Sequence, residues 1–193
     1  IKTVLIGFGY RGKQLFRLLQ HIPSFHIAAI ADPCVASSDV EGCMYYSDGE
    51  EDYLRMIREE CPDLVVIASP WRHHVQQTLH CLQAGCHVAL EIKGGLCQDE
   101  YQAVIELSKT VNRNVYPLEN TIFMREILAI YNATQAGVLG EIVHMTGGYR
   151  HDLRNLLIDS TGRLTNPNDP EGSWRSHFYE TENGDLYPTH GLA

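Results

Sequence analysis

The stretch Gly7-Phe-Gly9-Tyr-Arg-Gly12 decides the fold, because it fits the pattern G-x-G-x-x-G between a short apolar run and a helical pattern. Such a turn joins the first strand to the first helix of a dinucleotide-binding sheet. In it Gly7 permits the tight turn, Gly9 lets the backbone approach a pyrophosphate, and Gly12 lets the helix pack closely on the strand. The pyrophosphate would lie on the helix N-terminus, where free N–H groups and the dipole favour an anion. We therefore expect a cofactor site made by Gly7, Phe8, Gly9, Tyr10, Arg11 and Gly12.

An acidic residue lies at the spacing from the glycine turn that is typical of a dinucleotide-binding site. Asp32 lies 20 residues past Gly12, at the end of a strand predicted at residues 26–31. Its carboxylate would accept hydrogen bonds from the adenosine ribose and repel a 2′-phosphate, so NAD is preferred over NADP. The alternative is a tight turn in an α/β fold that binds no nucleotide.

Short apolar runs alternate with helical patterns as far as residue 118. The alternation predicts a parallel sheet with crossover helices, so the fold class is α/β, a doubly wound Rossmann domain over residues 1–118. Beyond Leu118 the pattern changes to a longer helix at 122–135, a strand at 141–146 and a polar region at 159–185, and we place a domain boundary there. In the first domain we predict strands at 3–6, 26–31, 64–68, 87–90 and 114–117, and helices at 11–22, 50–59, 73–84 and 99–111.

The composition narrows the range of partners. The chain has 193 residues, with 24 acidic against 15 basic side chains and a formal net charge of −9. No block of Lys and Arg is present to neutralise phosphates, so we expect no nucleic-acid binding. The apolar runs, such as Leu64–Ala68, are far shorter than the roughly 18 residues of a membrane helix, so we expect no membrane span. A small-molecule partner is favoured.

The cysteines and histidines do not indicate a metal site. The six cysteines lie in the first half of the chain, and no pair has C-x-x-C spacing. We expect reduced thiols that act as small buried hydrophobes, which favours a reducing compartment such as the cytoplasm. The first residue is Ile1 rather than Met, so a removed signal peptide and a periplasmic location stay open.

Polar or aromatic side chains follow the predicted third, fourth and fifth strands of the first domain. Since ligands bind at the carboxyl ends of parallel strands, we expect these side chains to converge on one crevice. One of the two adjacent histidines is expected only to supply the polarity of a helix's first turn. The residues concerned are Ser69, Trp71, His73, His74, Glu91 and Asn120.

Together these motifs resemble the Gfo/Idh/MocA oxidoreductases. The resemblance lies in the glycine turn, in Val66-Ile-Ala-Ser-Pro70 with His74 four residues on, and in Ala84-Gly-Cys-His-Val-Ala-Leu-Glu91. It implies an NAD-binding Rossmann domain, followed at 119–193 by the beginning of an α+β substrate domain with an open sheet, through which family members assemble as homo-oligomers.

The chain departs from the family's usual pattern at one place. Family dehydrogenases usually read Glu-Lys-Pro after the fourth strand, and the lysine acts on the substrate alcohol. Here the run is Glu91-Ile-Lys-Gly94, so Lys93 is displaced by one position, which in an extended segment turns its side chain the other way. A plain sugar dehydrogenase is therefore disfavoured.

The second half is similar to glycoside hydrolase family 109, a group of the same superfamily that also lacks that lysine. The similarity lies in Glu119-Asn120, in residues 140–154, in Trp174 and in Asn183-Gly-Asp-Leu-Tyr-Pro-Thr-His-Gly191. It implies that Tyr187 and His190 are catalytic and that Tyr149 and Trp174 bind the sugar. It further implies that the nicotinamide half of NAD is bound by Ser69, Trp71, His74, Glu91, Ile92 and Asn120.

The implied activity is that of an NAD-dependent enzyme acting on a sugar. The resemblance implies a glycosidase in which bound NAD transiently oxidises sugar C3, which permits elimination of the aglycone. A histidine suits the proton transfers because it titrates near neutrality, but the sequence does not assign which of Tyr187 and His190 moves which proton. Two alternatives are a conventional NAD-dependent sugar or polyol dehydrogenase and a non-catalytic nucleotide-binding module. Because the family's substrate domain is longer than residues 119–193, we expect a truncated chain with an incomplete sugar site.

Overall fold

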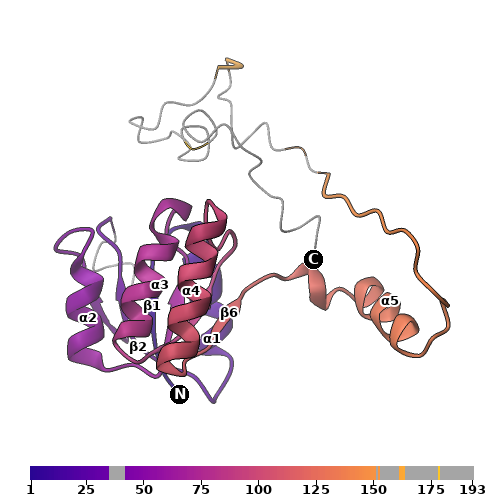
Figure 1. The fold of residues 1–193 in the computed structure, drawn as a ribbon. Helices are drawn as coiled ribbons and strands as arrows, with labels where there is room; N and C mark the ends of the chain where they lie inside the picture. The colour runs from indigo at the N-terminus through magenta and orange to yellow at the C-terminus, as the bar shows by residue number, and fades with distance from the viewer. Residues whose placement is uncertain (35–41, 151, 153–160, 164–177, 179–193) are drawn as a thin grey trace. The chain divides into compact units, whose positions relative to one another are not determined.

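A computed structural model describes residues 1–34, 42–150, 152, 161–163 and 178 (Figure 1). The chain divides into two compact units, Ile1–Leu118 and Glu119–Ala193. No helix in the described part of the chain is long and apolar enough to cross a membrane.

The first unit is built on one six-stranded sheet in which all neighbouring strands are parallel. The strand order is β3-β2-β1-β4-β5-β6. From β1 the chain adds β2 and β3 toward one side of the sheet, and it then returns to add β4, β5 and β6 on the other side of β1. This is the order of a doubly wound Rossmann sheet, and the predicted fold class is confirmed. The strands are β1 (Lys2–Ile6), β2 (His26–Ala31), β3 (Met44–Tyr46), β4 (Leu64–Ile67), β5 (His87–Leu90) and β6 (Val115–Pro117).

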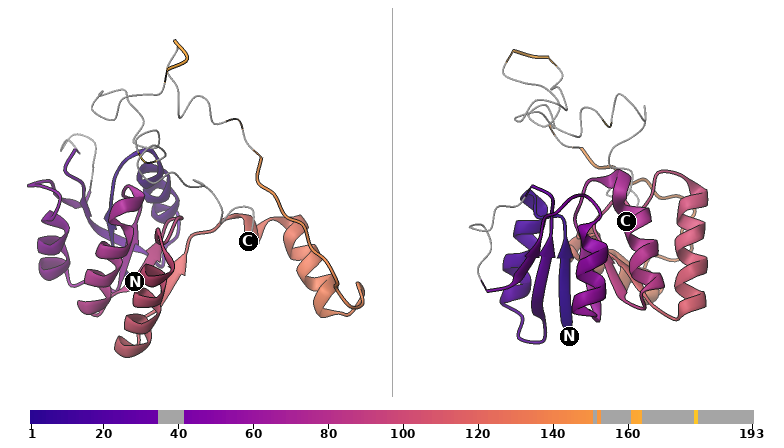
Figure 2. Two further views of the ribbon diagram at one scale, coloured as in Figure 1. Left: turned by 45° about the horizontal axis from the view of Figure 1, so that its top comes forward. Right: turned by 90° about the vertical axis from the view of Figure 1, so that its left-hand side faces the viewer.

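Helices cover both faces of this sheet (Figure 2). Successive residues of a strand point to opposite faces, so Leu5 of β1 packs with Leu15 and Phe16 of α1, whereas Val4 and Ile6 belong to the core on the other face. That second core is the larger one, because three helices contribute to it. The helices of this unit are α1 (Tyr10–Gln20), α2 (Asp52–Glu60), α3 (His74–Gln83) and α4 (Gln98–Val111), with a 3-10 turn η2 (Trp71–His73) before α3.

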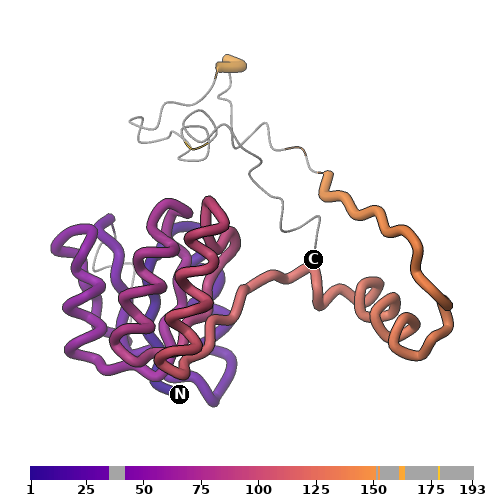
Figure 3. The backbone as a smooth tube through the Cα atoms, viewed as in Figure 1, coloured from indigo at the N-terminus to yellow at the C-terminus, as the bar shows by residue number. Residues whose placement is uncertain are grey.

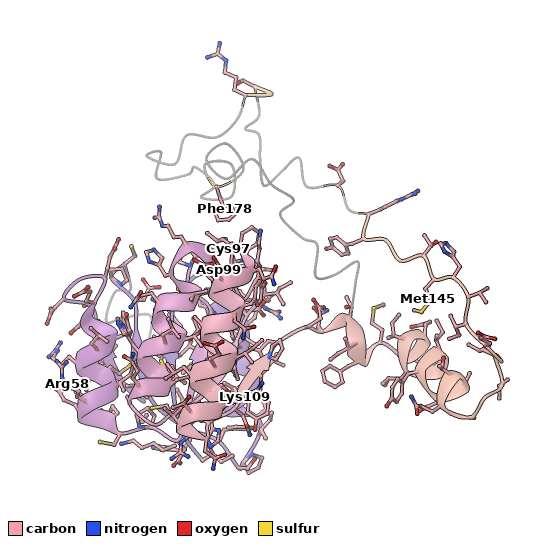
Figure 4. The ribbon with its side chains drawn as sticks, in the orientation of Figure 1. Arg58, Cys97, Asp99, Lys109, Met145 and Phe178 are labelled. Carbon is pink, nitrogen blue, oxygen red and sulfur yellow. The ribbon has the colours of Figure 1, made fainter. Side chains whose placement is uncertain are left out.

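The strands begin at the edge of the sheet where the N-terminus lies, and they end at the opposite edge (Figure 3). Figure 4 shows Cys97 and Asp99 at the beginning of α4, and Lys109 near its far end, at the same edge as Arg58 of α2. Acidic side chains in the first turn and basic ones in the last turn complement the dipoles of α2 and α4. The helix N-termini are thus collected at the edge where the strands end.

The cysteines only partly follow the prediction. All six are free, but Cys34, Cys61 and Cys97 are exposed, so the expectation of buried thiols is wrong for them. Cys81 and Cys86 are buried at the end of α3, where the N–H of Cys86 donates to the carbonyl of Cys81 at 3.0 Å. This is the hydrogen bond of a helix-ending Schellman motif, whose two terminal positions commonly make an apolar contact.

The strand β3 was not predicted. It has three residues, which is too short for an alternating pattern to show. It forms because it lies beside β2, whose outer backbone N–H and C=O groups would otherwise have no partner strand.

In the second unit, the helix predicted at 122–135 is split into a 3-10 turn η3 (Thr121–Phe123) and α5 (Arg125–Gln135). The strand predicted at 141–146 is wrong, because these residues form no regular structure. A strand needs a neighbour to pair with its N–H and C=O groups, and residues 119–150 contain no other strand. The alternating apolar residues Val143 and Met145 are accordingly exposed.

Candidate functional site

The glycine turn between β1 and α1 is held by direct contact of backbone with backbone. A Cβ on Gly12 would lie 2.1 Å from the carbonyl oxygen of Gly7, and a Cβ on Gly7 would lie 2.5 Å from the backbone nitrogen of Ser69. Gly7 also has a φ of +89°, which L side chains rarely adopt. Packing within the unit therefore explains these two glycines, as predicted for the turn and for the close approach of helix and strand.

Gly9 is different, because no atom of the described residues lies within 4 Å of where its Cβ would be. It precedes α1 as the N-cap residue without a side-chain cap, and the first turn of α1 holds no acidic residue. The space beside the turn and the N–H groups at the start of α1 thus fit a pyrophosphate. Tyr10, the first residue of α1, is strongly exposed at the same place.

Asp32 lies against this turn. Its Oδ2 accepts a hydrogen bond from the N–H of Phe8 at 2.6 Å, and its Oδ1 accepts one from the N–H of Cys34 at 2.8 Å. These two bonds fix the carboxylate beside the turn. Each carboxylate oxygen can accept more than one hydrogen bond, so ribose hydroxyls could still bind there. The predicted partners Phe8 and Asp32 are therefore brought together.

Two loops at the ends of β4 and β5 are tied to each other by side chains. The indole Nε1 of Trp71 donates to the carbonyl of Ile92 at 2.8 Å. The ring of His74 contacts two carbonyl oxygens, that of Lys93 through Nδ1 at 2.6 Å and that of Ser69 through Nε2 at 2.8 Å. The convergence predicted at these strand ends is present for Ser69, Trp71, His74 and Glu91.

Arg11 bridges the glycine turn and the end of β5. Its Nε donates to Oε1 of Glu91 at 2.5 Å, and the N–H of Ile92 donates to Oε2 of the same carboxylate at 3.1 Å. The Glu91 side chain is only 10% exposed, whereas that of Arg11 is 39% exposed, so only the carboxylate is shielded from water. Sequence reasoning placed Arg11 and Glu91 separately at the cofactor and did not foresee that they pair, because residues 80 apart in the chain carry no sign of contact.

Sequence reasoning also missed two neighbours of the site. Buried Gln77 accepts a hydrogen bond from the hydroxyl of Ser69 at 2.6 Å. The ammonium of Lys93 lies 6.0 Å from the ring centroid of Trp71, at the outer limit of a cation–π contact. Its displacement by one position therefore leaves the ammonium beside the strand-end loops. No pattern in the sequence marks either contact.

The remaining site predictions concern the second unit. Tyr187, His190 and Trp174 lie outside the described residues. Asn120 precedes η3, and Tyr149 is exposed in a segment without regular structure, so their predicted roles stay predictions. Within the described part of the chain there is no group of three or more His, Cys, Asp or Glu residues that could hold a metal ion.

The histidines beside the site are perturbed by burial. Burial lowers the pKa of His74 below its ordinary value of 6.5, and the two carbonyl contacts offset part of this effect because they favour the protonated ring. Burial, followed by the charge of Arg72, also lowers the pKa of His73. Both rings therefore resist protonation in the folded chain.

Comparison with known proteins identifies the first unit. Residues 1–93 match the Gfo/Idh/MocA family model, described as an oxidoreductase family with an NAD-binding Rossmann fold. The Rossmann unit is therefore similar to the NAD-binding domain of the Gfo/Idh/MocA oxidoreductases. The predicted resemblance is confirmed, and the predicted cofactor, NAD, is that of the family.

The second unit has a separate match, to the C-terminal domain of glycosyl hydrolase family 109, over residues 123–193. Curated relatives align over the whole chain. They include a glycosyl hydrolase family 109 protein of Shewanella amazonensis, 32% identical, and one of Saccharopolyspora erythraea, 29% identical. The chain spans 43% of the length of each of these two relatives.

Solved structures of two dehydrogenases share the fold. Myo-inositol 2-dehydrogenase from Lactobacillus plantarum superposes with a TM-score of 0.65 at 22% identity, over 76% of this chain and 44% of its own. The WlbA dehydrogenase from Chromobacterium violaceum, solved in complex with NADH and UDP-GlcNAcA, gives a TM-score of 0.66 at 19% identity, over 72% and 41%.

Alanine substitutions separate the glycine that packing requires from the one that a ligand requires. Gly12→Ala should lower the free energy of unfolding by about 1–3 kcal/mol, because its Cβ meets the backbone of Gly7. Gly9→Ala should cost no more than about 1 kcal/mol, yet weaken NAD binding at least about tenfold, because its Cβ occupies the pyrophosphate space. Urea unfolding and calorimetric titration measure the two effects. Unchanged NAD affinity in Gly9→Ala would show that the pyrophosphate does not bind at this turn.

The lowered pKa of His74 predicts that the Rossmann unit loses stability in acid. Below the ordinary value of 6.5 the unfolded chain takes up a proton that the folded ring resists, so stability is full above that pH and falls as the pH drops toward the folded pKa. Urea unfolding between about pH 7.5 and about pH 5 should show this loss, with a smaller slope in His74→Gln. Equal slopes in the two proteins would show that His74 does not carry the effect.

Proposed function

We propose that the Rossmann unit binds NAD across the ends of its strands. In this proposal the pyrophosphate lies on the N-terminus of α1, the adenosine ribose on Asp32, and the nicotinamide half beside Trp71 and Glu91. The observation that carries the proposal is the open space beside Gly9, a glycine for which residues 1–34 and 42–150 supply no packing reason. The family's NAD-binding description supports the same cofactor.

Asp32 gives the proposed site its preference for NAD over NADP. Its carboxylate is held against the turn by the N–H groups of Phe8 and Cys34, so it cannot easily turn away from a ligand. A 2′-phosphate would therefore meet a fixed negative charge, whereas the 2′-hydroxyl of NAD can donate to it.

The reaction we propose is glycosidic cleavage assisted by reversible oxidation of a sugar, with a small sugar or glycoside as substrate and a homo-oligomer as the working form. The match of residues 123–193 to the family 109 domain supports it, as do relatives of that name along the whole chain. NAD, when bound, supplies a reversible hydride acceptor. In this proposal Trp71 and Glu91 orient the nicotinamide ring. Tyr187 and His190 move the protons.

Glu91 is suited to orientation rather than to proton transfer. One oxygen accepts from Arg11 and the other from the N–H of Ile92, so both carboxylate oxygens are already held in place at the end of β5. Proton transfer is better assigned to a histidine such as His190, because an imidazole titrates near neutrality.

Asp32→Ala tests the cofactor site. Loss of charge-assisted hydrogen bonds should weaken NAD binding about ten- to a hundredfold and reduce the preference for NAD over NADP. Calorimetric titration of the 193-residue chain with each dinucleotide measures both changes. Asp99→Ala, an exposed change in the first turn of α4, is the matched control and should leave both affinities as they are. An unchanged preference in Asp32→Ala would contradict the assignment.

The glycosidase proposal is tested on a protein that carries this chain in full, incubated with NAD and a panel of chromogenic α- and β-glycosides that includes an α-N-acetylgalactosaminide. Release of the chromophore without net NADH is the expected result. NADH that accumulates with an oxidisable sugar would instead indicate a conventional dehydrogenase. Binding of NAD with neither signal would contradict both enzymatic proposals and favour a nucleotide-binding module.

A further inference from the structure

An ion-pair network between α2 and the segment after β3 has no part in the chemistry proposed above. Nη2 of Arg55, in α2, donates to Oδ2 of Asp48 at 2.9 Å. Nε of Arg55 donates to Oδ1 of Asp52 at 2.7 Å, and Nη2 donates to Oδ2 of Asp52 at 2.9 Å. The guanidinium carbon also lies 4.9 Å from the ring centroid of Tyr46, within reach of a cation–π contact. Arg55 is therefore held by two carboxylates and one aromatic ring.

The two carboxylates of this network differ in exposure. The Asp52 side chain is only 6% exposed, and its Oδ2 also accepts a hydrogen bond from the N–H of Asp48 at 2.9 Å. The Asp48 side chain, in contrast, is 79% exposed. Asp52 is thus the inner anchor of Arg55, whereas Asp48 covers the guanidinium from the water side. A ligand that approaches from water would have to replace Asp48 and not Asp52.

The sheet places this network next to Asp32, the residue proposed to bind the adenosine ribose. Ala31 at the end of β2 pairs with Tyr46 at the end of β3, and the N–H of Asp32 donates to the carbonyl of Tyr46 at 3.0 Å. Neighbouring strands of a sheet lie about 4.8 Å apart. Asp48 follows Tyr46 by two residues, so it leaves the sheet at the same edge, beside the end of β2.

The charges in this part of the sequence bear on which dinucleotide binds. From Leu18 to Leu54 the sequence contains no lysine or arginine, so Arg55 is the first one after β2. A guanidinium can bind a phosphate through two parallel hydrogen bonds. In Arg55, however, Nε and Nη2 are engaged with carboxylates. Residues 48–55 hold four acidic side chains against this one basic side chain, so a phosphate would meet an excess of negative charge there.

We propose that Asp48 is a second specificity-determining residue, which selects against NADP by covering Arg55. Without Asp48 the guanidinium would be open to a 2′-phosphate, and one repulsive charge would be gone. Neither change concerns the 2′-hydroxyl of NAD, so the affinity for NADP should rise while that for NAD stays the same. Asp32 acts differently, because its loss should also weaken NAD binding. The inference rests on the NAD site proposed above.

The test compares NAD⁺ with NADP⁺ in calorimetric titrations of the full 193-residue chain. In Asp48→Asn the affinity for NADP⁺ should rise about three- to tenfold, while the affinity for NAD⁺ stays within about twofold. Adding Arg55→Met to Asp48→Asn should abolish the gain, because the guanidinium that receives the phosphate is lost. Adding Arg58→Met instead is the matched control and should preserve the gain, since Arg58 lies near the opposite end of α2 (Figure 4).

Unchanged NADP⁺ affinity in Asp48→Asn would overturn the inference, and so would a gain that survives Arg55→Met. A wild-type chain that binds neither dinucleotide would refute the NAD site itself, which separates that failure from failure of the inference. If the methionine variant does not fold, Arg55→Lys takes its place in the Asp48→Asn background. It should keep only part of the gain, because an ammonium cannot form the paired hydrogen bonds of a guanidinium. A full gain with lysine would contradict the role assigned to Arg55.

Discussion

The close approach of three backbone segments at the end of β1 is the constraint on which the rest of the site depends. Gly12 lies against the carbonyl of Gly7, and Gly7 lies against Ser69, with no space for a Cβ at either glycine. The ring of His74 lies between the carbonyl oxygens of Ser69 and Lys93, with one ring nitrogen close to each. A continuous series of contacts therefore runs from the start of α1 to the loop after β5.

Where parallel strands end, their last backbone groups lose the sheet as a partner, and side chains must replace it. Asp32 accepts from the N–H of Phe8, Glu91 from that of Ile92, and Trp71 donates to the carbonyl of Ile92. The residues proposed to meet NAD are thus also the residues that complete the hydrogen bonding of this edge. Substitutions there are expected to affect stability and ligand binding together, which is why the matched controls and paired ligands matter.

The two units differ in how their apolar side chains are used. In the Rossmann unit, side chains from both faces of the sheet form cores that the helices cover. In α5 of the second unit no residue is buried, and Ile130 and Tyr131 are more than half exposed. A helix of this length gains little stability without such burial. The chain spans less than half the length of the relatives it matches, and these extend the family 109 resemblance over both units.

By itself the sequence determined the alternation of strands and helices, the glycine turn and the place of Asp32 at the end of β2, because these depend on local periodicity and on fixed spacings. It failed at β3 and at residues 141–146, because a strand exists only where another strand offers it unpaired groups. It could not show that Arg11 pairs with Glu91, or that His74 rather than His73 is buried between two carbonyls. Those outcomes join residues far apart in the chain, and only the winding of the sheet brings them to one edge.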